Sequence, residues 1–181
     1  MTTRRDGTIE RARVESDEVR YATDAVVTVD APDIAQLKGA AARNARQRIR
    51  LCAHHSVDDR LHEMLIVHAR GTYVRPHKHV GKTESFHVIE GEVDVVLFED
   101  DGRVREVIPM GSFASGRPFF YRMAGPVFHT LLIRSEFLVF HEVTGGPFRR
   151  ADTVFAPWAP ADGDVQAVGD FLGALEGRLS A

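Results

Sequence analysis

Cysteine is almost absent from the chain, whose 181 residues include one, Cys52. A single thiol cannot form a disulfide within the chain, which excludes a disulfide-stabilised scaffold. Long apolar runs are absent as well, since no window approaches the roughly 20 apolar residues of a membrane-spanning helix. The polar segment at 1–10 lacks the apolar core of a secretory signal peptide. From these absences we expect a cytoplasmic protein.

A large excess of charge is also missing. The formal net charge is −3, and the basic residues are spread along the chain rather than clustered. We therefore expect no binding to nucleic acid and no association with an anionic membrane. The hydrophobic content of 44% is typical of a globular protein. A chain of this length buries roughly 70% of its unfolded surface as one domain.

The pattern along the chain predicts a flexible arm followed by one domain. Residues 1–24 are charged and without clear periodicity, which predicts a flexible N-terminal arm, and residues 25–181 are expected to form a single domain. A short strand is expected at Val26–Val29. Asp30 is then the cap of a helix that ends near Arg43, and a last helix is expected at about 164–179.

Between about 48 and 148, short segments rich in valine, isoleucine, phenylalanine and tyrosine alternate with glycine, aspartate and proline. The expected strands are 49–53, 62–68, 73–78, 84–90, 92–98, 103–108, 119–123, 128–133 and 136–143. Many short strands at close spacing predict a mostly β protein whose core is a sandwich or a barrel.

Three residues in the segment 71–91 stand at the spacing of metal ligands: His77, His79 and Glu84. Side chains two apart on a strand point to the same face, about 6.6 Å apart at their Cα atoms, so the two imidazoles can converge on one ion. Glu84 returns on the next strand. Imidazole nitrogen and carboxylate oxygen suit iron, manganese, zinc, nickel or copper.

With its flanking Gly71 and Gly91, this segment resembles the first motif of the cupins, a superfamily of small jelly-roll β-barrels. The resemblance implies one divalent transition metal inside the barrel, bound by His77, His79 and Glu84. It also implies a further histidine from a second motif, for which His129 is the best match. That second motif departs from the superfamily pattern, and the departing positions are Ala124, Pro126 and Ile133.

More narrowly, the chain resembles the WbuC-type cupin metalloproteins. The matching segments are 48–54, 71–79, 82–84, 97–98, 140–148 and 155–160. This family is often associated with bacterial O-antigen and polysaccharide gene clusters. The resemblance therefore implies a role in bacterial polysaccharide metabolism, while the reaction stays open.

Two further groups are candidates for the lining of a substrate pocket. Arg48, Arg50, Cys52 and His54 are in phase on one expected strand, so the arginines can select an anionic substrate. The alternative is that the arginines are solvated and Cys52 is a small buried hydrophobe. Tyr73 and Arg75 are in phase with His77, which predicts that they face the same cavity.

Candidates for proton transfer are Glu142, Tyr73 and His54. Glu142 and His141 are neighbours on one strand, so only one of them faces inward. The phase of Leu138 and Phe140 favours Glu142, whereas the phase of Phe137 and Val139 supports His141 nearly as well. The remaining histidines have a structural interpretation. His62 and His68 share a face with Met64 and Ile66, which is typical of half-buried histidines.

Three functions are compatible with these residues. The first is a metal-dependent enzyme, with isomerase or epimerase-like chemistry, acting on a small polar substrate such as a sugar or sugar-derived metabolite. The second is a metal-containing binding or regulatory protein without turnover. The third is an iron-dependent dioxygenase, because three histidines and one glutamate leave two positions of an octahedron open.

The expected partners are a small anionic or sugar-like molecule and a second copy of the chain. Val165, Val168, Leu172, Leu175 and Leu179 form one apolar stripe on the last expected helix. This stripe and the expected strand Val26–Val29 are the two features that predict a homodimer.

Overall fold

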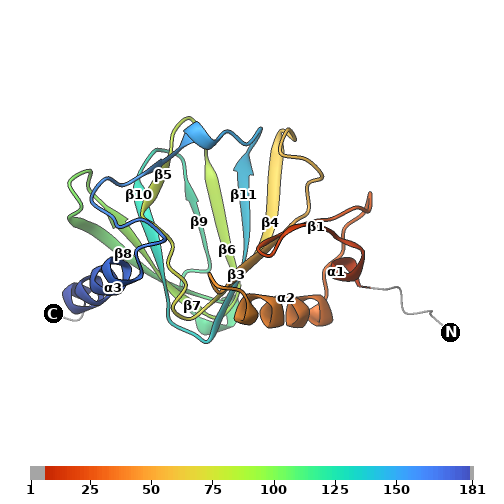
Figure 1. Ribbon diagram of the computed structural model, residues 1–181, viewed down its shortest axis with the longest axis horizontal. Coiled ribbons are helices and arrows are strands. Elements are labelled where there is room, and N and C mark those ends of the chain that lie inside the picture. Colours follow the sequence, from red (N-terminus) through yellow and green to blue (C-terminus); the bar gives the residue numbers. More distant parts are fainter. Residues whose placement is uncertain (1–6, 180–181) are drawn as a thin grey trace.

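Two β-sheets that face each other form the centre of the structure, and helices lie at their outer sides (Figure 1). The structure, a computed structural model, describes residues 7–179. The larger sheet has seven strands in the order β1-β2-β3-β4-β11-β6-β9, and the smaller has five in the order β12-β5-β10-β7-β8.

The strands of the larger sheet are β1 (Arg13–Ser16), β2 (Val19–Tyr21), β3 (Arg48–Cys52), β4 (Leu61–Ala69), β11 (Phe137–Gly145), β6 (Glu84–Glu90) and β9 (Phe120–Met123). Those of the smaller sheet are β12 (Thr153–Phe155), β5 (His77–His79), β10 (Phe128–Ile133), β7 (Glu92–Phe98) and β8 (Val104–Gly111). The mostly β prediction is confirmed. A closed barrel is not formed, because among residues 7–179 each strand pairs only within its own sheet.

The expected strands at 49–53, 62–68, 84–90, 92–98 and 128–133 agree closely with the observed strands. The expected strand at 73–78 is wrong, since β5 contains only His77–His79. Before it the chain is irregular, and its carbonyls bond outside a strand ladder. The Val74 carbonyl accepts a hydrogen bond from Thr130 Oγ1, and the Pro76 carbonyl accepts one from the amide of Ala156.

The turn between β6 and β7 depends on Gly91, which has a φ of 90°. A Cβ atom built on this residue would lie 2.2 Å from the carbonyl oxygen of Phe137. Glycine is therefore required here both by the backbone conformation and by the close approach of β11.

The helix predicted after Asp30 is α2 (Ala31–Arg43). The Asp30 side chain accepts a hydrogen bond from the amide of Asp33, and the Asp33 side chain accepts one from the amide of Asp30, which forms a capping box. Leu37 of α2 packs against Ile49 of β3 on the outer side of the larger sheet. The helix thus covers the face of β3 that points away from the second sheet.

The second predicted helix is α3 (Val165–Leu179), and it lies at the outer side of the smaller sheet (Figure 1). Leu175 is fully buried, and Leu172 and Leu179 pack in the same cluster. Most of the apolar stripe is therefore covered by the chain itself, although Val165 at its start is 81% exposed. This packing removes one reason for expecting a homodimer.

The expectation of a flexible arm at 1–24 is wrong from Thr8 onward, where the chain forms regular elements. Its first six residues lie outside the described part, but the rest forms a short helix, α1 (Thr8–Arg11), and then β1 and β2. β2 pairs in parallel with β3. The short strand expected at Val26–Val29 is not formed, because Val27 and Val29 pack their side chains under α2 instead of joining a sheet.

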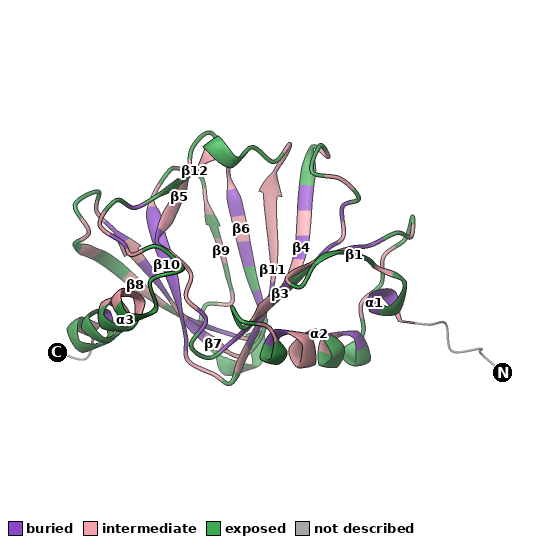
Figure 2. Cartoon of the chain, viewed as in Figure 1, coloured by how far each residue is buried: buried purple, intermediate pink, exposed green. Residues whose placement is uncertain are grey.

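Successive side chains along each strand of the larger sheet point alternately to its outer face and to the face toward the second sheet. Leu65 and Val67 of β4 pack on the side of α2. The β4 residues on the opposite side are His62, Met64, Ile66 and His68. Figure 2 shows buried residues alternating with more exposed ones along these strands. No helix of the described residues is long and apolar enough to cross a membrane.

Candidate metal centre

His77, His79 and His129 come together at one end of the space between the sheets. His77 and His79 lie at the two ends of β5, and His129 of β10 is the register partner of His77. One side-chain nitrogen of each can be chosen so that all three lie within 4.8 Å of one another. Three histidines can thus bind a metal ion here.

Hydrogen bonds hold the Nδ1 atoms of these rings away from the cluster. His77 Nδ1 lies 2.8 Å from the Arg75 carbonyl oxygen, and His129 Nδ1 lies 3.0 Å from that of Val127. A carbonyl oxygen only accepts, so Nδ1 carries the proton in both rings and Nε2 is left to bind a cation. His79 Nδ1 is 3.2 Å from Thr153 Oγ1 of β12.

Glu84, the first residue of β6, brings a carboxylate from the larger sheet to the same place. Its Oε2 atom lies 3.2 Å from His79 Nε2 and 3.8 Å from His129 Nε2. The Tyr121 hydroxyl donates a hydrogen bond of 2.7 Å to Oε1. One oxygen of this buried carboxylate is therefore held by the protein while the other faces the histidines.

The electrostatics of the cluster suit a cation. Burial, followed by the neighbouring His129, lowers the pKa of His77 to about 3, so its ring is neutral and its Nε2 has a free lone pair. Burial alone would raise the pKa of Glu84, but the hydrogen bond from His79, the charge of His129 and the Tyr121 hydroxyl lower it to about 2. Imidazole nitrogens beside an ionised carboxylate form a donor set that fits a divalent transition metal.

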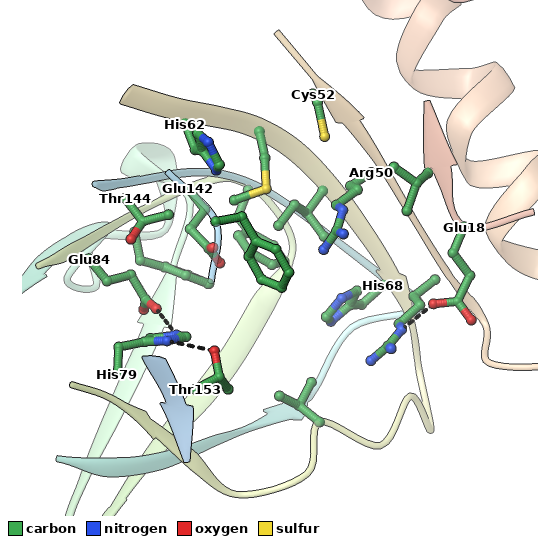
Figure 3. A pocket seen from close by; sticks show the side chains of 18 of the residues that line it. Glu18, Arg50, Cys52, His62, His68, His79, Glu84, Glu142, Thr144 and Thr153 are labelled. Atoms are coloured by element: carbon green, nitrogen blue, oxygen red, sulfur yellow. Dashed lines mark hydrogen bonds and ion pairs between the residues drawn. The ribbon is translucent and has the colours of Figure 1, made fainter. Parts of the chain in front are cut away.

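The cluster opens into a cavity of about 460 Å³ between the sheets. Figure 3 shows Glu84 and His79 at one side of this cavity and Arg50 and His68 at another, with Glu142 between His62 and Glu84. The volume is in the range of small-molecule sites.

Of the candidates for proton transfer, Glu142 lines the cavity, whereas its neighbour His141 has its Nε2 4.0 Å from Glu63 Oε1. Burial, together with the negative charge of Glu84, raises the pKa of Glu142 to about 8. His54 also lines the cavity, but its Nδ1 lies 3.1 Å from the Glu63 carbonyl oxygen. Burial lowers the pKa of His54.

Arg48, Arg50 and Cys52 line the cavity, as their common phase on one strand predicts. Arg48 is paired with Glu18, since its Nε lies 2.8 Å from Glu18 Oε2. Cys52 is buried, and burial raises the pKa of its thiol. Arg50 has no ion pair within 4.0 Å among residues 7–179.

Tyr73 and Arg75 do not line the cavity, contrary to the expectation from their phase with His77. The Tyr73 hydroxyl donates a hydrogen bond to the Pro160 carbonyl, and burial raises its pKa to about 12. The Arg75 guanidinium lies 4.8 Å from the ring centroid of Phe155. The reason is that a period of two requires a regular strand, and this segment is irregular before His77.

Four residues of the site were not predicted as functional from the sequence: Tyr121, Thr153, His62 and His68. Tyr121 and Thr153 contact Glu84 and His79 from strands far apart in the chain, and no local pattern marks them. The shared face of the two histidines on β4 was visible in the sequence. That this face lines a cavity follows only from the packing of the two sheets.

A family model described as a domain of unknown function, DUF6016, matches residues 29–110. This is less than half of the 181-residue chain and includes His77, His79 and Glu84 but not His129. No curated protein matches the chain.

Several solved structures are similar. A protein from Shewanella oneidensis has a TM-score of 0.50 at 10% identity, over 62% of this chain and 75% of that one. A sugar phosphate isomerase from a cupin superfamily, from Silicibacter pomeroyi, has a TM-score of 0.39 at 20% identity, over 49% of this chain and 52% of that one. The capsular polysaccharide assembling protein CapF from Staphylococcus aureus has a TM-score of 0.48 at 16% identity, over 62% of this chain and 32% of that one.

The chain thus spans about half of the isomerase and a third of CapF. At these identities the comparisons concern folds, and the Shewanella protein shares the fold over more than half of this chain. Similar solved structures include a protein described as a cupin, and this chain has three histidines that can bind a metal between its two sheets.

Proposed function

We propose that the chain is a metal-dependent cupin enzyme that isomerises or epimerises a small polar substrate of the sugar class. The observation that carries this proposal is the presence of Glu142 in the same cavity as His77, His79, His129 and Glu84. Burial raises the pKa of the Glu142 carboxyl above its ordinary value, and a carboxyl that can hold a proton can accept one from a substrate and return it.

The ligands would be the Nε2 atoms of the three histidines and Oε2 of Glu84. A bound divalent ion would supply Lewis-acid polarisation of a substrate carbonyl or hydroxyl oxygen, and iron, manganese, zinc and nickel all suit these donors. Tyr121 and Thr153 position Glu84 and His79 through the hydrogen bonds described above.

Glu142 would act on the carbon next to the substrate carbonyl. Its carboxylate takes the proton as the carbon–hydrogen bond breaks, and the electron pair of that bond moves into an enediolate. Transfer of the substrate's hydroxyl proton from one enediolate oxygen to the other, and return of the first proton to the neighbouring carbon, complete the isomerisation with no net change in atoms or oxidation state. Glu142 is a proton carrier in this proposal, whereas His54 and Tyr73 have no part in it because their hydrogen bonds occupy them elsewhere.

The test combines elemental analysis with proton exchange. Purified protein is analysed for transition metals and incubated in D₂O with a panel of aldoses, ketoses, their phosphates and uronic acids. We expect one bound metal per chain and deuterium incorporation next to a carbonyl, followed by NMR. Glu142→Gln should retain the metal and lose the exchange, whereas Glu106→Gln on β8 should retain both.

Two other functions are outcomes of the same test. Metal without exchange, but with tight binding of one panel member, would indicate a binding or regulatory protein. Oxygen consumption by an iron-loaded sample would indicate a dioxygenase. Either result would contradict the proposed isomerase.

We also propose a cytoplasmic homodimer that serves bacterial polysaccharide metabolism, as the WbuC-type resemblance suggests. For the dimer, support comes from Phe113 and Phe120, which are 77% and 53% exposed. Phe120 belongs to β9, the edge strand of the larger sheet, and exposed edge strands readily pair with another chain.

A further inference from the structure

The end of the cavity opposite the metal ligands contains polar groups that the proposed chemistry does not use. His68 is 7% exposed and lines the cavity, yet its Nδ1 atom is buried without a hydrogen-bond partner. A buried polar atom without a partner is costly, so such an atom beside a cavity can gain free energy from a group that binds there. Figure 3 shows Arg50 and His68 projecting from β3 and β4 into the same part of the cavity.

This end of the cavity is positively charged. Burial, followed by the charges of Arg48, Arg46 and Arg50, lowers the pKa of His68 to about 3. Arg46 and Arg48 both approach the carboxylate of Glu18, with nitrogen–oxygen distances of 3.6 Å and 2.8 Å. The positive charge of Arg50 is not neutralised by an ion pair, because no carboxylate among residues 7–179 lies within ion-pair distance of it. Its guanidinium has donors available for a ligand.

The strand register places this end far from the metal ligands. Across the larger sheet, Arg50 of β3 pairs with Ile66 of β4, which in turn pairs with Phe140 of β11. Phe140 pairs with Val88 of β6, which is four residues after Glu84. Arg50 is therefore level with Val88. Three strand spacings and four residues correspond to roughly 20 Å between the Cα atoms in a flat sheet. The side chains extend toward each other from both ends, which leaves room for a small molecule between them.

We propose that Arg50 and His68 form a subsite for a compact oxyanion, either a phosphate or a carboxylate, at the end of the cavity opposite the metal ligands. The guanidinium fork binds two oxygens of such a group, and the neutral imidazole of His68 donates from the nitrogen that lacks a partner. This inference rests on the proposed function and specifies its substrate class. The substrate is a sugar derivative with an anionic group at one end and a carbonyl or hydroxyl oxygen at the other.

The test measures binding to the metal-loaded protein by calorimetry. The probes are glucose 6-phosphate, glucuronate and glucose, which carry a phosphate, a carboxylate and no charge. We expect at least one anionic probe to bind at least about tenfold more tightly than glucose. Tighter binding of glucose 6-phosphate identifies a phosphate site and tighter binding of glucuronate a carboxylate site, and both outcomes support the subsite.

Variants assign the binding to residues. Arg50→Met should lower the affinity for the anionic probe by roughly 10- to 100-fold. His68→Phe, which keeps an aromatic ring beside Phe140, should lower that affinity by roughly tenfold. The matched controls are Arg105→Met and His87→Phe, whose exposed side chains do not line the cavity and which should leave affinity unchanged. Metal content should stay at the wild-type level in all four.

The results separate this inference from the proposed function. If no anionic probe binds more tightly than glucose, or if Arg50→Met binds it as the wild type does, the subsite is wrong even when metal and proton exchange are present. If Arg50 is needed for the anionic probe but the metal-loaded protein catalyses no proton exchange, the proposed enzyme is wrong and the subsite stands.

Discussion

Glu142 and Glu84 are diagonal neighbours on the cavity face of the larger sheet. Thr144 pairs with Glu84 across β11 and β6, and Glu142 lies two residues before Thr144 on the same face. A buried carboxyl and a half-buried one this close together do not ionise equally. The pKa of Glu84 falls to about 2 because histidines and Tyr121 support its charge, while burial and the charge of Glu84 raise the pKa of Glu142 to about 8.

This relationship predicts a pH-dependent stability in the metal-free protein. The pKa of Glu142 rises from an ordinary 4.5 to about 8 in the folded state. At a pH between these two pKa values, the Glu142 carboxyl is ionised in the unfolded chain and protonated in the folded chain. The stabilising contribution of the protonated carboxyl is therefore complete below pH 4.5 and is lost as pH rises toward 8.

Glu142→Gln removes this titration. Relative to wild type, the free energy of unfolding of the variant should increase by up to about 1.4 kcal/mol per pH unit across that window. Urea unfolding at pH 5 and pH 7, both inside the interval from 4.5 to about 8, measures the change. Glu106→Gln is the control. Parallel pH profiles for wild type and Glu142→Gln would contradict the raised pKa.

Removal of a proposed ligand should remove the metal. His129→Ala deletes an Nε2 that faces Glu84 at 3.8 Å, and water would have to fill the vacated position. We expect metal content after dialysis to fall well below that of wild type. His87→Ala, on an exposed side chain of β6, is the matched control and should retain the metal. Equal metal content in both variants would exclude His129 as a ligand.

Removal of one hydroxyl should weaken the site without destroying it. Tyr121→Phe deletes the hydrogen bond to Glu84 Oε1 and keeps the ring stacked on Phe86. Loss of such a group, which orients a ligand, lowers metal affinity by about 10- to 100-fold. Competition with a chelator of known affinity measures this, and circular dichroism checks the fold. An affinity equal to that of wild type would show that Glu84 needs no support from Tyr121.

Arg75→Met should act on stability rather than on ligand binding. Its guanidinium stacks on Phe155 and donates a hydrogen bond of 3.4 Å to the Ala159 carbonyl, outside the cavity. We expect a loss of about 1 kcal/mol in unfolding free energy and no change in affinity for glucose 6-phosphate or glucuronate. Denaturant unfolding and calorimetry give the two values. If Arg75→Met lowers the affinity for these anionic probes as much as Arg50→Met does, Arg75 contributes to ligand binding and this prediction is wrong.

The homodimer can be tested by sedimentation equilibrium. A dimer has about twice the mass of the 20.1 kDa chain. If the exposed edge at β9 forms the interface, Phe120→Asp should shift the equilibrium toward monomer because a charge would be buried there. Val14→Asp, on the exposed strand β1 at the opposite edge, is the control. A wild-type mass near 20.1 kDa at micromolar concentration would contradict the homodimer.

Local patterns predicted the elements where neighbouring residues decide the structure. The capping residues Asp30 and Asp33 specify the start of α2 within four residues of sequence. Alternation correctly placed Arg48, Arg50 and Cys52 on one face of β3. The same alternation failed for Tyr73 and Arg75, because carbonyls in this segment accept hydrogen bonds from the Thr130 side chain and from the amide of Ala156, outside a regular strand ladder.

The sequence by itself determined that His77, His79 and Glu84 lie close together along the chain, at a spacing that suits a metal. Only the tertiary structure decided which distant groups join them. β10 and β12 bring His129 and Thr153 beside β5, and β9 brings Tyr121 to Glu84. The raised pKa of Glu142 and the unpartnered nitrogen of His68 also arise from burial between two sheets. This burial cannot be predicted from neighbouring residues, because it depends on the packing of strands that are far apart in the chain.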